Sequence, residues 1–61
     1  MKNLNLLIGL TGTAATVLRF NGYIIIDNER YVARSQVWIE AGTIVIVRKV
    51  EFNQLIVSPL V

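Results

Sequence analysis

Residues branched at Cβ constrain the fold of this chain more than any other feature. Twenty of its 61 residues are valine, isoleucine or threonine, and such side chains favour the pleated, half-buried surface of a sheet over a helix. No stretch of eleven or more residues places apolar side chains at helical spacing. We therefore expect an all-β chain.

Turn signals divide the chain into short segments. Asn21-Gly22 and Asp27-Asn28 contain residues that tolerate a positive φ, and residues 51–54 join the last two segments as a hairpin. Residues 36–42 form a connection that is long enough for about one helical turn. Turns spaced at about 8–12 residues are typical of a small closed barrel. The expected strands are 11–18, 23–27, 30–35, 43–50 and 55–59.

Alternation along these strands predicts which side chains face the core. The predicted core residues are Val17, Ile24, Ile26, Ala33, Ile39, Val45, Val47, Val50, Leu55 and Val57. Apolar side chains also occupy outward positions, at Tyr23, Ile25, Val32, Ile44, Ile46 and Ile56. Two interpretations stay open. These residues scatter or are covered by loops, or some of them form one patch that meets another chain or domain.

The composition argues against catalysis and metal binding. The chain contains neither cysteine nor histidine, which removes the commonest general base, thiolate ligands and histidine-assisted nucleophiles. A dyad of Ser35 and Lys49 is conceivable, but both are predicted at ordinary exposed strand positions. The four carboxylates lie in or beside turns, where they shape the turn and keep the surface soluble: Asp27, Glu29, Glu40 and Glu51. We predict no catalytic, cofactor-binding or metal-binding residue.

The charge pattern gives little support for nucleic-acid binding. The net charge is +2, and the basic residues are scattered rather than clustered on one face: Lys2, Arg19, Arg30, Arg34, Arg48 and Lys49. Aromatic residues interleave with them as a single-strand-binding barrel requires, at Phe20, Tyr23, Tyr31 and Trp38. However, Tyr31 alternates with Arg30 and therefore points to the opposite side. Binding of single-stranded nucleic acid is kept as the alternative function.

The chain contains no direct membrane span. No apolar run approaches the roughly 20 residues that cross a bilayer. Residues 1–10 faintly resemble a signal peptide, but Asn5 and Gly9 interrupt the apolar run. We expect a short lead-in, or a start inside a longer protein, followed by a single domain over 1–61 with its barrel at about 7–59.

Five motifs in order resemble the C-terminal soluble domain of NfeD-like membrane proteins. The family pattern reads G-x-x-G-x-A, L-R-P-x-G, I-D-G-x-R, I-x-x-G-x-x-V-x-V and L-x-V-x-P. The corresponding segments are 9–14, 18–22, 26–30, 39–47 and 55–59. Phe20 stands where the family usually has proline, and Asn28 where it usually has glycine. Ile25, Ile44 and Ile46 occupy outward positions that are usually charged or polar.

The resemblance implies a five-stranded OB-fold barrel of Greek-key topology. In the family, this soluble domain usually follows transmembrane helices, so the resemblance implies membrane association through segments outside this chain, on an undetermined side. Some members carry a ClpP-like serine protease domain, of which none is present here. Members are associated with stomatin- and flotillin-type membrane scaffold proteins and with regulation of membrane protease activity.

We therefore expect a non-catalytic protein–protein interaction module with a stomatin- or flotillin-like partner. The expected interaction patch comprises the outward apolar residues Tyr23, Ile25, Val32, Ile44, Ile46 and Ile56. Self-association is a further expectation, because an apolar surface with low net charge promotes it.

Overall fold

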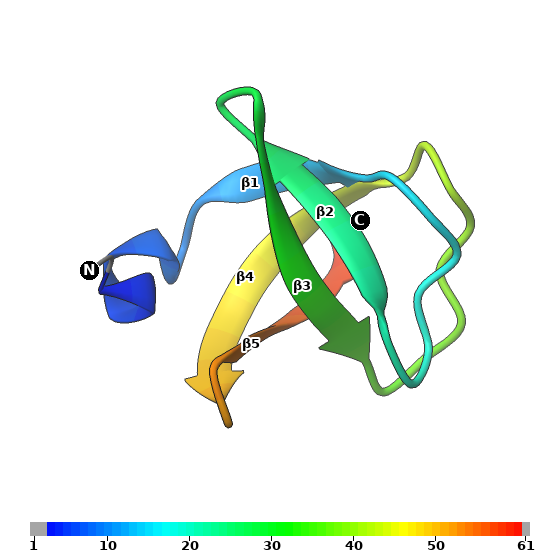
Figure 1. The fold of residues 1–61 in the computed structure, drawn as a ribbon. Helices are drawn as coiled ribbons and strands as arrows, with labels where there is room; N and C mark the ends of the chain where they lie inside the picture. Colours follow the sequence, from blue (N-terminus) through cyan, green and yellow to red (C-terminus); the bar gives the residue numbers. More distant parts are fainter. Residues whose placement is uncertain (1–2, 61) are drawn as a thin grey trace.

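The chain forms a short 3-10 helix followed by five strands (Figure 1). The computed structural model describes residues 3–60, so Lys2 and the start of the lead-in lie outside the described part. The elements are η1 (Leu4–Leu7), β1 (Thr11–Ala14), β2 (Gly22–Ile26), β3 (Glu29–Ser35), β4 (Ile44–Glu51) and β5 (Gln54–Pro59).

The five strands close into a barrel in the order β1-β2-β3-β5-β4. Neighbouring strands are antiparallel except β3 and β5, which run parallel, and β1 closes the barrel by pairing with both β2 and β4. The prediction of an all-β, five-stranded, OB-fold-like barrel is confirmed. Every strand of the closed barrel has neighbours on both sides, so none offers its whole length as a free edge to another chain.

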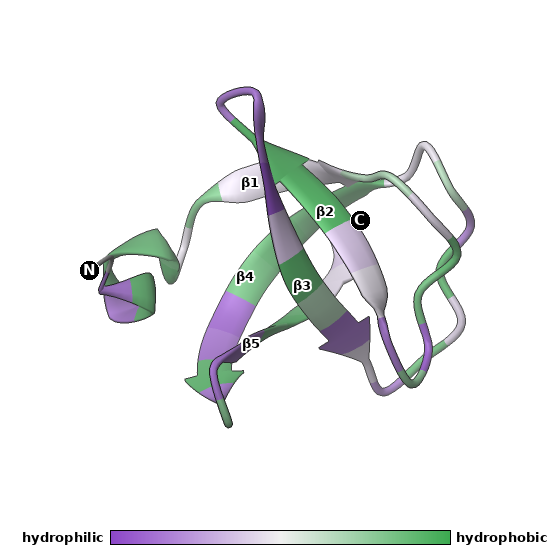
Figure 2. Cartoon of the chain, in the orientation of Figure 1, coloured by the Kyte–Doolittle hydropathy of each residue, from purple (hydrophilic) through white to green (hydrophobic). Residues whose placement is uncertain are grey.

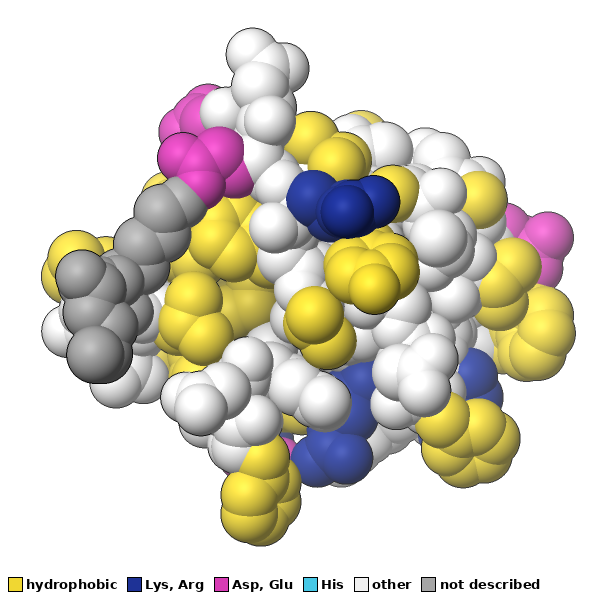
Figure 3. Space-filling model, in the orientation of Figure 1, with side chains coloured by type: hydrophobic (Ala, Val, Ile, Leu, Met, Phe, Trp, Pro, Cys, Tyr) yellow, Lys and Arg dark blue, Asp and Glu magenta, His cyan; other side chains and the backbone are white. Residues whose placement is uncertain are grey.

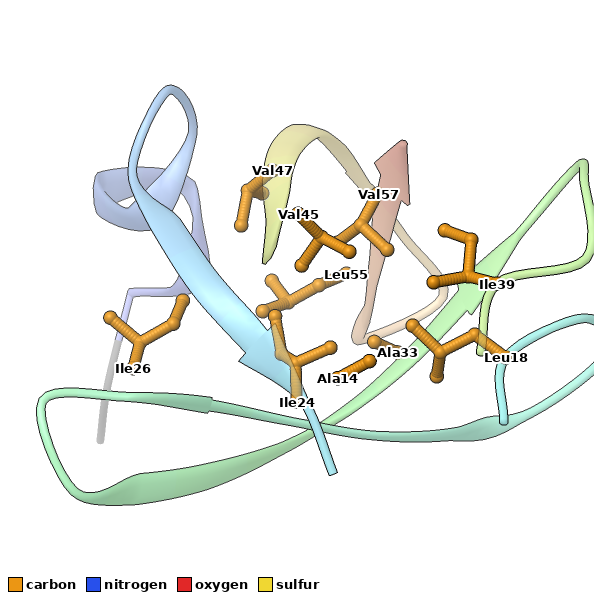
Figure 4. Packing of buried hydrophobic residues seen from close by; sticks show 10 residues of the cluster. All are labelled: Ala14, Leu18, Ile24, Ile26, Ala33, Ile39, Val45, Val47, Leu55 and Val57. Atoms are coloured by element: carbon orange, nitrogen blue, oxygen red, sulfur yellow. The ribbon is translucent and has the colours of Figure 1, made fainter. Parts of the chain in front are cut away.

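One cluster of aliphatic side chains fills the barrel (Figure 4). Its members are Ala14, Leu18, Ile24, Ile26, Ala33, Ile39, Val45, Val47, Leu55 and Val57. Leu4, Leu7, Tyr31 and Val50 pack against this cluster and are partly buried. The predicted burial of Val50 is therefore only partly correct. Because η1 supplies Leu4 and Leu7, the lead-in contributes to the core. Residues 36–42, where one helical turn would fit, contain no helix.

The prediction for the end of the first strand is wrong. β1 ends at Ala14, four residues before the predicted end, and Val17 is 39% exposed, whereas Leu18 is fully buried. Leu18 leaves the alternation because it forms an isolated bridge with Ile39, in which each N–H donates to the other residue's carbonyl at 2.9 and 3.0 Å. This bridge brings two loop residues into the core.

Two hairpins turn on two residues with positive φ. Asp27 and Asn28 (φ 51° and 66°) connect β2 to β3, and Phe52 and Asn53 (φ 52° and 62°) connect β4 to β5. Two left-handed residues in a two-residue loop define a type I′ turn, whose twist matches that of the flanking strands. Asx residues occupy this conformation at low cost, whereas an aromatic residue does so only with strain.

A β-bulge in β4 changes the character of that strand. The register between β4 and β5 shifts between Val47 and Lys49, which leaves Arg48 as the extra residue. Before the bulge, β4 alternates core-facing valines with outward isoleucines. After it, β4 presents Arg48 and Lys49 to the outside. Figure 2 shows this change from hydrophobic to hydrophilic along β4.

Leu18→Ala should destabilise the barrel by about 2–5 kcal/mol, because it removes a fully buried side chain from a packed core. The neighbouring Val17→Ala should cost less than about 1 kcal/mol, because that side chain is partly exposed outside the sheet. Urea unfolding followed by circular dichroism measures both. A greater loss of stability for Val17→Ala than for Leu18→Ala would contradict the finding that Leu18, and not Val17, is the core residue.

Gly12→Ala should destabilise the barrel by about 1–3 kcal/mol through overpacking. An added Cβ would lie 2.6 Å from the carbonyl oxygen of Ile25 and 2.8 Å from Cγ1 of Ile26. Thr11→Ala, on the same strand but exposed, is the matched control. Equal unfolding midpoints for the two variants would show that β1 and β2 do not require this close approach.

Candidate functional site

Five of the outward apolar residues lie on the outside of β2, β3 and β4, and β1 separates β2 from β4. Tyr23 on β2 pairs directly with Val32 on β3. Ile25 on β2 and Ile44 on β4 both pair with Thr13, which lies between them on β1. Because paired residues share a face of the sheet, Tyr23 adjoins Val32, and Ile25 and Ile44 flank Thr13. We call the group Tyr23, Ile25, Val32, Ile44 and Ile46 the outer apolar face.

The outer apolar face is open to solvent. Tyr23, Val32 and Ile44 are 39%, 41% and 48% exposed, and Ile25 and Ile46 are half-buried. Aliphatic side chains that adjoin one another on a surface mark interaction sites more often than isolated ones do. The arrangement can therefore bury apolar surface against a partner without a change in the barrel.

One cation is stacked on this face. Arg30 pairs with Ile25 across β2 and β3, and its guanidinium carbon lies 4.8 Å from the centroid of the Tyr23 ring. Figure 3 shows hydrophobic and basic groups meeting over these strands. Tyrosine and arginine dominate the binding energy of many interfaces, because each supplies both apolar contact and hydrogen bonds. Their pairing is the most polar feature of an otherwise aliphatic face.

Ile56 departs from the sequence prediction. It is 7% exposed and lies on the outside of β5, apart from the outer apolar face. Its neighbours on the adjacent strands are Arg34 and Lys49, and Glu51 forms ion pairs with both, at 3.4 and 3.3 Å. Its predicted outward direction is correct, but its predicted exposure is wrong because these long charged side chains surround it.

A basic surface that sequence reasoning missed surrounds Ile56. Two shallow cavities of about 190 and 210 Å³ share Ser35, Gln36 and Ile56. The first is also lined by Arg19 and Arg34, the second by Arg48 and Lys49, so residues that are scattered in sequence are gathered by the fold. We call this surface the basic trough. The one sequence signal for it is the adjacency of Arg48 and Lys49.

The candidate catalytic pair is not assembled. Ser35 and Lys49 line the same cavity, but the Ser35 Oγ accepts a hydrogen bond from the Val37 N–H at 3.1 Å. The Lys49 side chain is half exposed, and its ammonium group is paired with Glu51. No buried general base adjoins the hydroxyl in residues 3–60, so the geometry supplies neither an activated nucleophile nor a desolvated amine.

Other ligand chemistries find no assembled site in the described part of the chain. No group of three or more carboxylates comes together there as a metal site. The aromatic residues of the nucleic-acid hypothesis are dispersed: Arg19 lies over the Phe20 ring, Tyr31 donates a hydrogen bond to Glu29, and Trp38 donates one to Glu40. They do not form one stacking platform. Within residues 3–60, no helix is long and apolar enough to cross a bilayer.

Comparison with known proteins identifies the family. Residues 4–59 match the model of the NfeD-like C-terminal, partner-binding domain. The structure is similar to the C-terminal domain of stomatin operon partner protein 1510-C from Pyrococcus horikoshii. The TM-score is 0.81, the sequence identity is 36%, and the alignment covers 88% of each chain. The comparison with curated proteins finds no match. This chain is a protein-interaction module that belongs to the family of NfeD-like C-terminal, partner-binding domains.

Proposed function

We propose that this domain binds a stomatin-like membrane scaffold protein through the outer apolar face. The observation that carries the proposal is the number of exposed or half-buried apolar side chains on the outside of the barrel. Tyr23, Ile25 and Val32 lie on the paired strands β2 and β3, and Ile44 and Ile46 lie on β4, on the other side of β1. Because no strand offers its whole length as an edge, side chains are the main means of holding a partner.

The choice of partner rests on the comparisons. The solved relative is named as a stomatin operon partner, and the matching family is described as partner-binding. The family resemblance extends the partner class to flotillin-like scaffolds, and it supports membrane attachment through segments outside these 61 residues. It also supports a role in regulating membrane proteases, carried out by binding rather than by catalysis. The module is accordingly proposed to be non-catalytic.

The physical character of the face suits a partner that is itself apolar. Three of its members expose between 39% and 48% of their surface, and burying one such side chain contributes about 1–2 kcal/mol at 25 cal/mol per Å². Aliphatic contacts alone would fix neither the identity nor the orientation of the partner. The charged and aromatic groups of the Arg30–Tyr23 stack supply that specificity. A second copy of this chain is the competing occupant, since the same face can pair with itself.

Ile44→Lys and Val32→Lys should each weaken scaffold binding at least tenfold, because a charge placed in the middle of an apolar contact must be desolvated. Val37→Lys is the matched control. It adds the same charge at a residue that is 50% exposed in the loop between β3 and β4, away from the face. Calorimetric titration with the soluble domain of a stomatin-like scaffold protein measures the three affinities. Amide spectra establish that each variant is folded.

Equal affinities for the unchanged chain, Ile44→Lys and Val32→Lys would contradict the outer apolar face as the binding site. Sedimentation equilibrium of the isolated domain tests the competing occupant. Self-association that both lysine variants abolish, without any scaffold binding, would assign the face to a homodimer. Titration with a single-stranded oligonucleotide at low salt tests the alternative function, which predicts amide shifts at Tyr23, Arg30 and Arg34.

A further inference from the structure

The basic trough lies between two exposed aromatic side chains. Phe20, in the loop between β1 and β2, lines the same cavity as Arg19, Arg34 and Glu51. Phe52 directly follows Glu51 at the tip of the β4–β5 hairpin. The two rings are 78% and 88% exposed. In Figure 3, hydrophobic groups project from the lower edge where Figure 1 places these two loops, and Lys and Arg groups lie between them.

Phe52 holds a conformation that costs free energy. Its φ of 52° places an aromatic residue in the left-handed region at the first position of a type I′ turn. The equivalent turn between β2 and β3 has Asp27 and Asn28, which adopt this conformation readily. With 88% of its surface exposed, Phe52 gains almost nothing from packing in return. Backbone strain that is not offset by packing within the chain is characteristic of residues at functional sites, where they contact a ligand or partner.

Positive charge is concentrated at the basic trough. Four cations and one carboxylate line the basic trough, and that carboxylate, Glu51, is already paired with Arg34 and Lys49. Asp27 and Glu29 lie at the β2–β3 turn, where Figure 3 shows acidic groups at the opposite edge of the view. Four cations against one carboxylate give the basic trough a net positive charge, which attracts a negative surface.

From these observations we infer that the basic trough docks the domain onto an anionic phospholipid surface, with Phe20 and Phe52 entering the interface between headgroups and acyl chains. Lysine and arginine attract anionic headgroups, and exposed aromatic side chains beside them add burial of apolar area. The cavities of about 190 and 210 Å³ are smaller than the roughly 300–1,000 Å³ of typical small-molecule sites. Rings on two convex loops meet a broad, deformable surface more readily than they enclose a peptide or stack along a nucleic acid.

The surface used here differs from the one proposed for the scaffold. The outer apolar face lies on β2, β3 and β4 before the bulge, whereas the basic trough extends over β3, β5 and β4 after it. Failure of either proposal therefore leaves the other standing.

Co-sedimentation with lipid vesicles tests the inference. At low salt, the intact chain should bind vesicles made of an equal mixture of phosphatidylglycerol and phosphatidylcholine. It should not bind vesicles of phosphatidylcholine alone. Added salt should weaken the binding to the mixed vesicles, because salt screens the attraction between the cations and the anionic headgroups.

Phe52→Asn should weaken binding to the mixed vesicles roughly tenfold, because it removes the exposed aromatic ring. It should also raise the unfolding temperature, because the turn loses its strain. Arg19→Gln and Lys49→Gln should each weaken binding about fivefold.

Two matched variants control for turn stability and net charge. Asn28→Gly eases the other type I′ turn without touching the basic trough, and Arg30→Gln removes one positive charge from the outer apolar face. Both should bind the anionic vesicles as the unchanged chain does. If neither vesicle binds, or if Phe52→Asn and Lys49→Gln bind as tightly as the controls, the inference is overturned. A lower unfolding temperature for Phe52→Asn would overturn the strain argument.

The same titrations separate the other polyanions. Poly-glutamate and a single-stranded oligonucleotide serve as soluble probes at the same salt concentration. Salt-sensitive binding of either one through Arg19 and Lys49, together with no binding to anionic vesicles, would assign the basic trough to an acidic protein or to nucleic acid and overturn the lipid assignment.

Discussion

Closure of the barrel depends on a strand of four residues. β1 pairs with β2 on one side and with β4 on the other, and its neighbouring backbone groups extend both ladders. The Ala14 N–H donates to the carbonyl of Thr43, and the Ala15 N–H donates to that of Tyr23. On the β2 side, this approach requires glycine at position 12. Gly12 meets the backbone of Ile25 at a distance that no Cβ would allow. Without β1, β2 and β4 would each expose an edge to other chains.

Because the barrel closes, the side chains inside it form the core and those outside it form the binding surfaces. The interior takes aliphatic side chains from every strand, and no buried polar side-chain atom of the described residues lacks a partner. The outside is divided in turn. β4 carries isoleucines before its bulge and cations after it, so one strand contributes to both the outer apolar face and the basic trough. A single extra residue, Arg48, thus separates two surfaces of opposite character on a very small domain.

Alternation and turn chemistry were sufficient to predict most of the fold. Strands two to five begin and end within one or two residues of the predicted bounds, and Ile24, Ala33, Val45 and Leu55 are buried as predicted. The errors occur where long-range contacts override the local pattern. Leu18 replaces Val17 in the core because it bridges to Ile39, about twenty residues away, and no periodicity within the first segment contains that information.

The candidate surfaces differ in how far they could be predicted. The outer apolar face follows from alternation, because its members lie on consecutive strands, and alternation also predicts the outward direction of Ile56. Its burial could not be predicted, because that depends on the parallel pairing of β3 with β5, which places Arg34 beside it. The basic trough has the same origin. Arg19 and Lys49 are thirty positions apart in sequence and become neighbours of one surface only when the barrel closes.

The least favourable local choices in the chain all lie on its outer surface. A domain of this size buries a small core and is only marginally stable, so about 1 kcal/mol is a sizeable fraction of its stability. Phe52 is strained, and the outer apolar face remains exposed to water. Neither feature helps the isolated barrel to fold, and both become favourable once a partner or an interface covers them. Binding then stabilises the folded state by mass action. Phe52 and the outer apolar face would in this way contribute to stability in the bound state, although they do not in the isolated barrel.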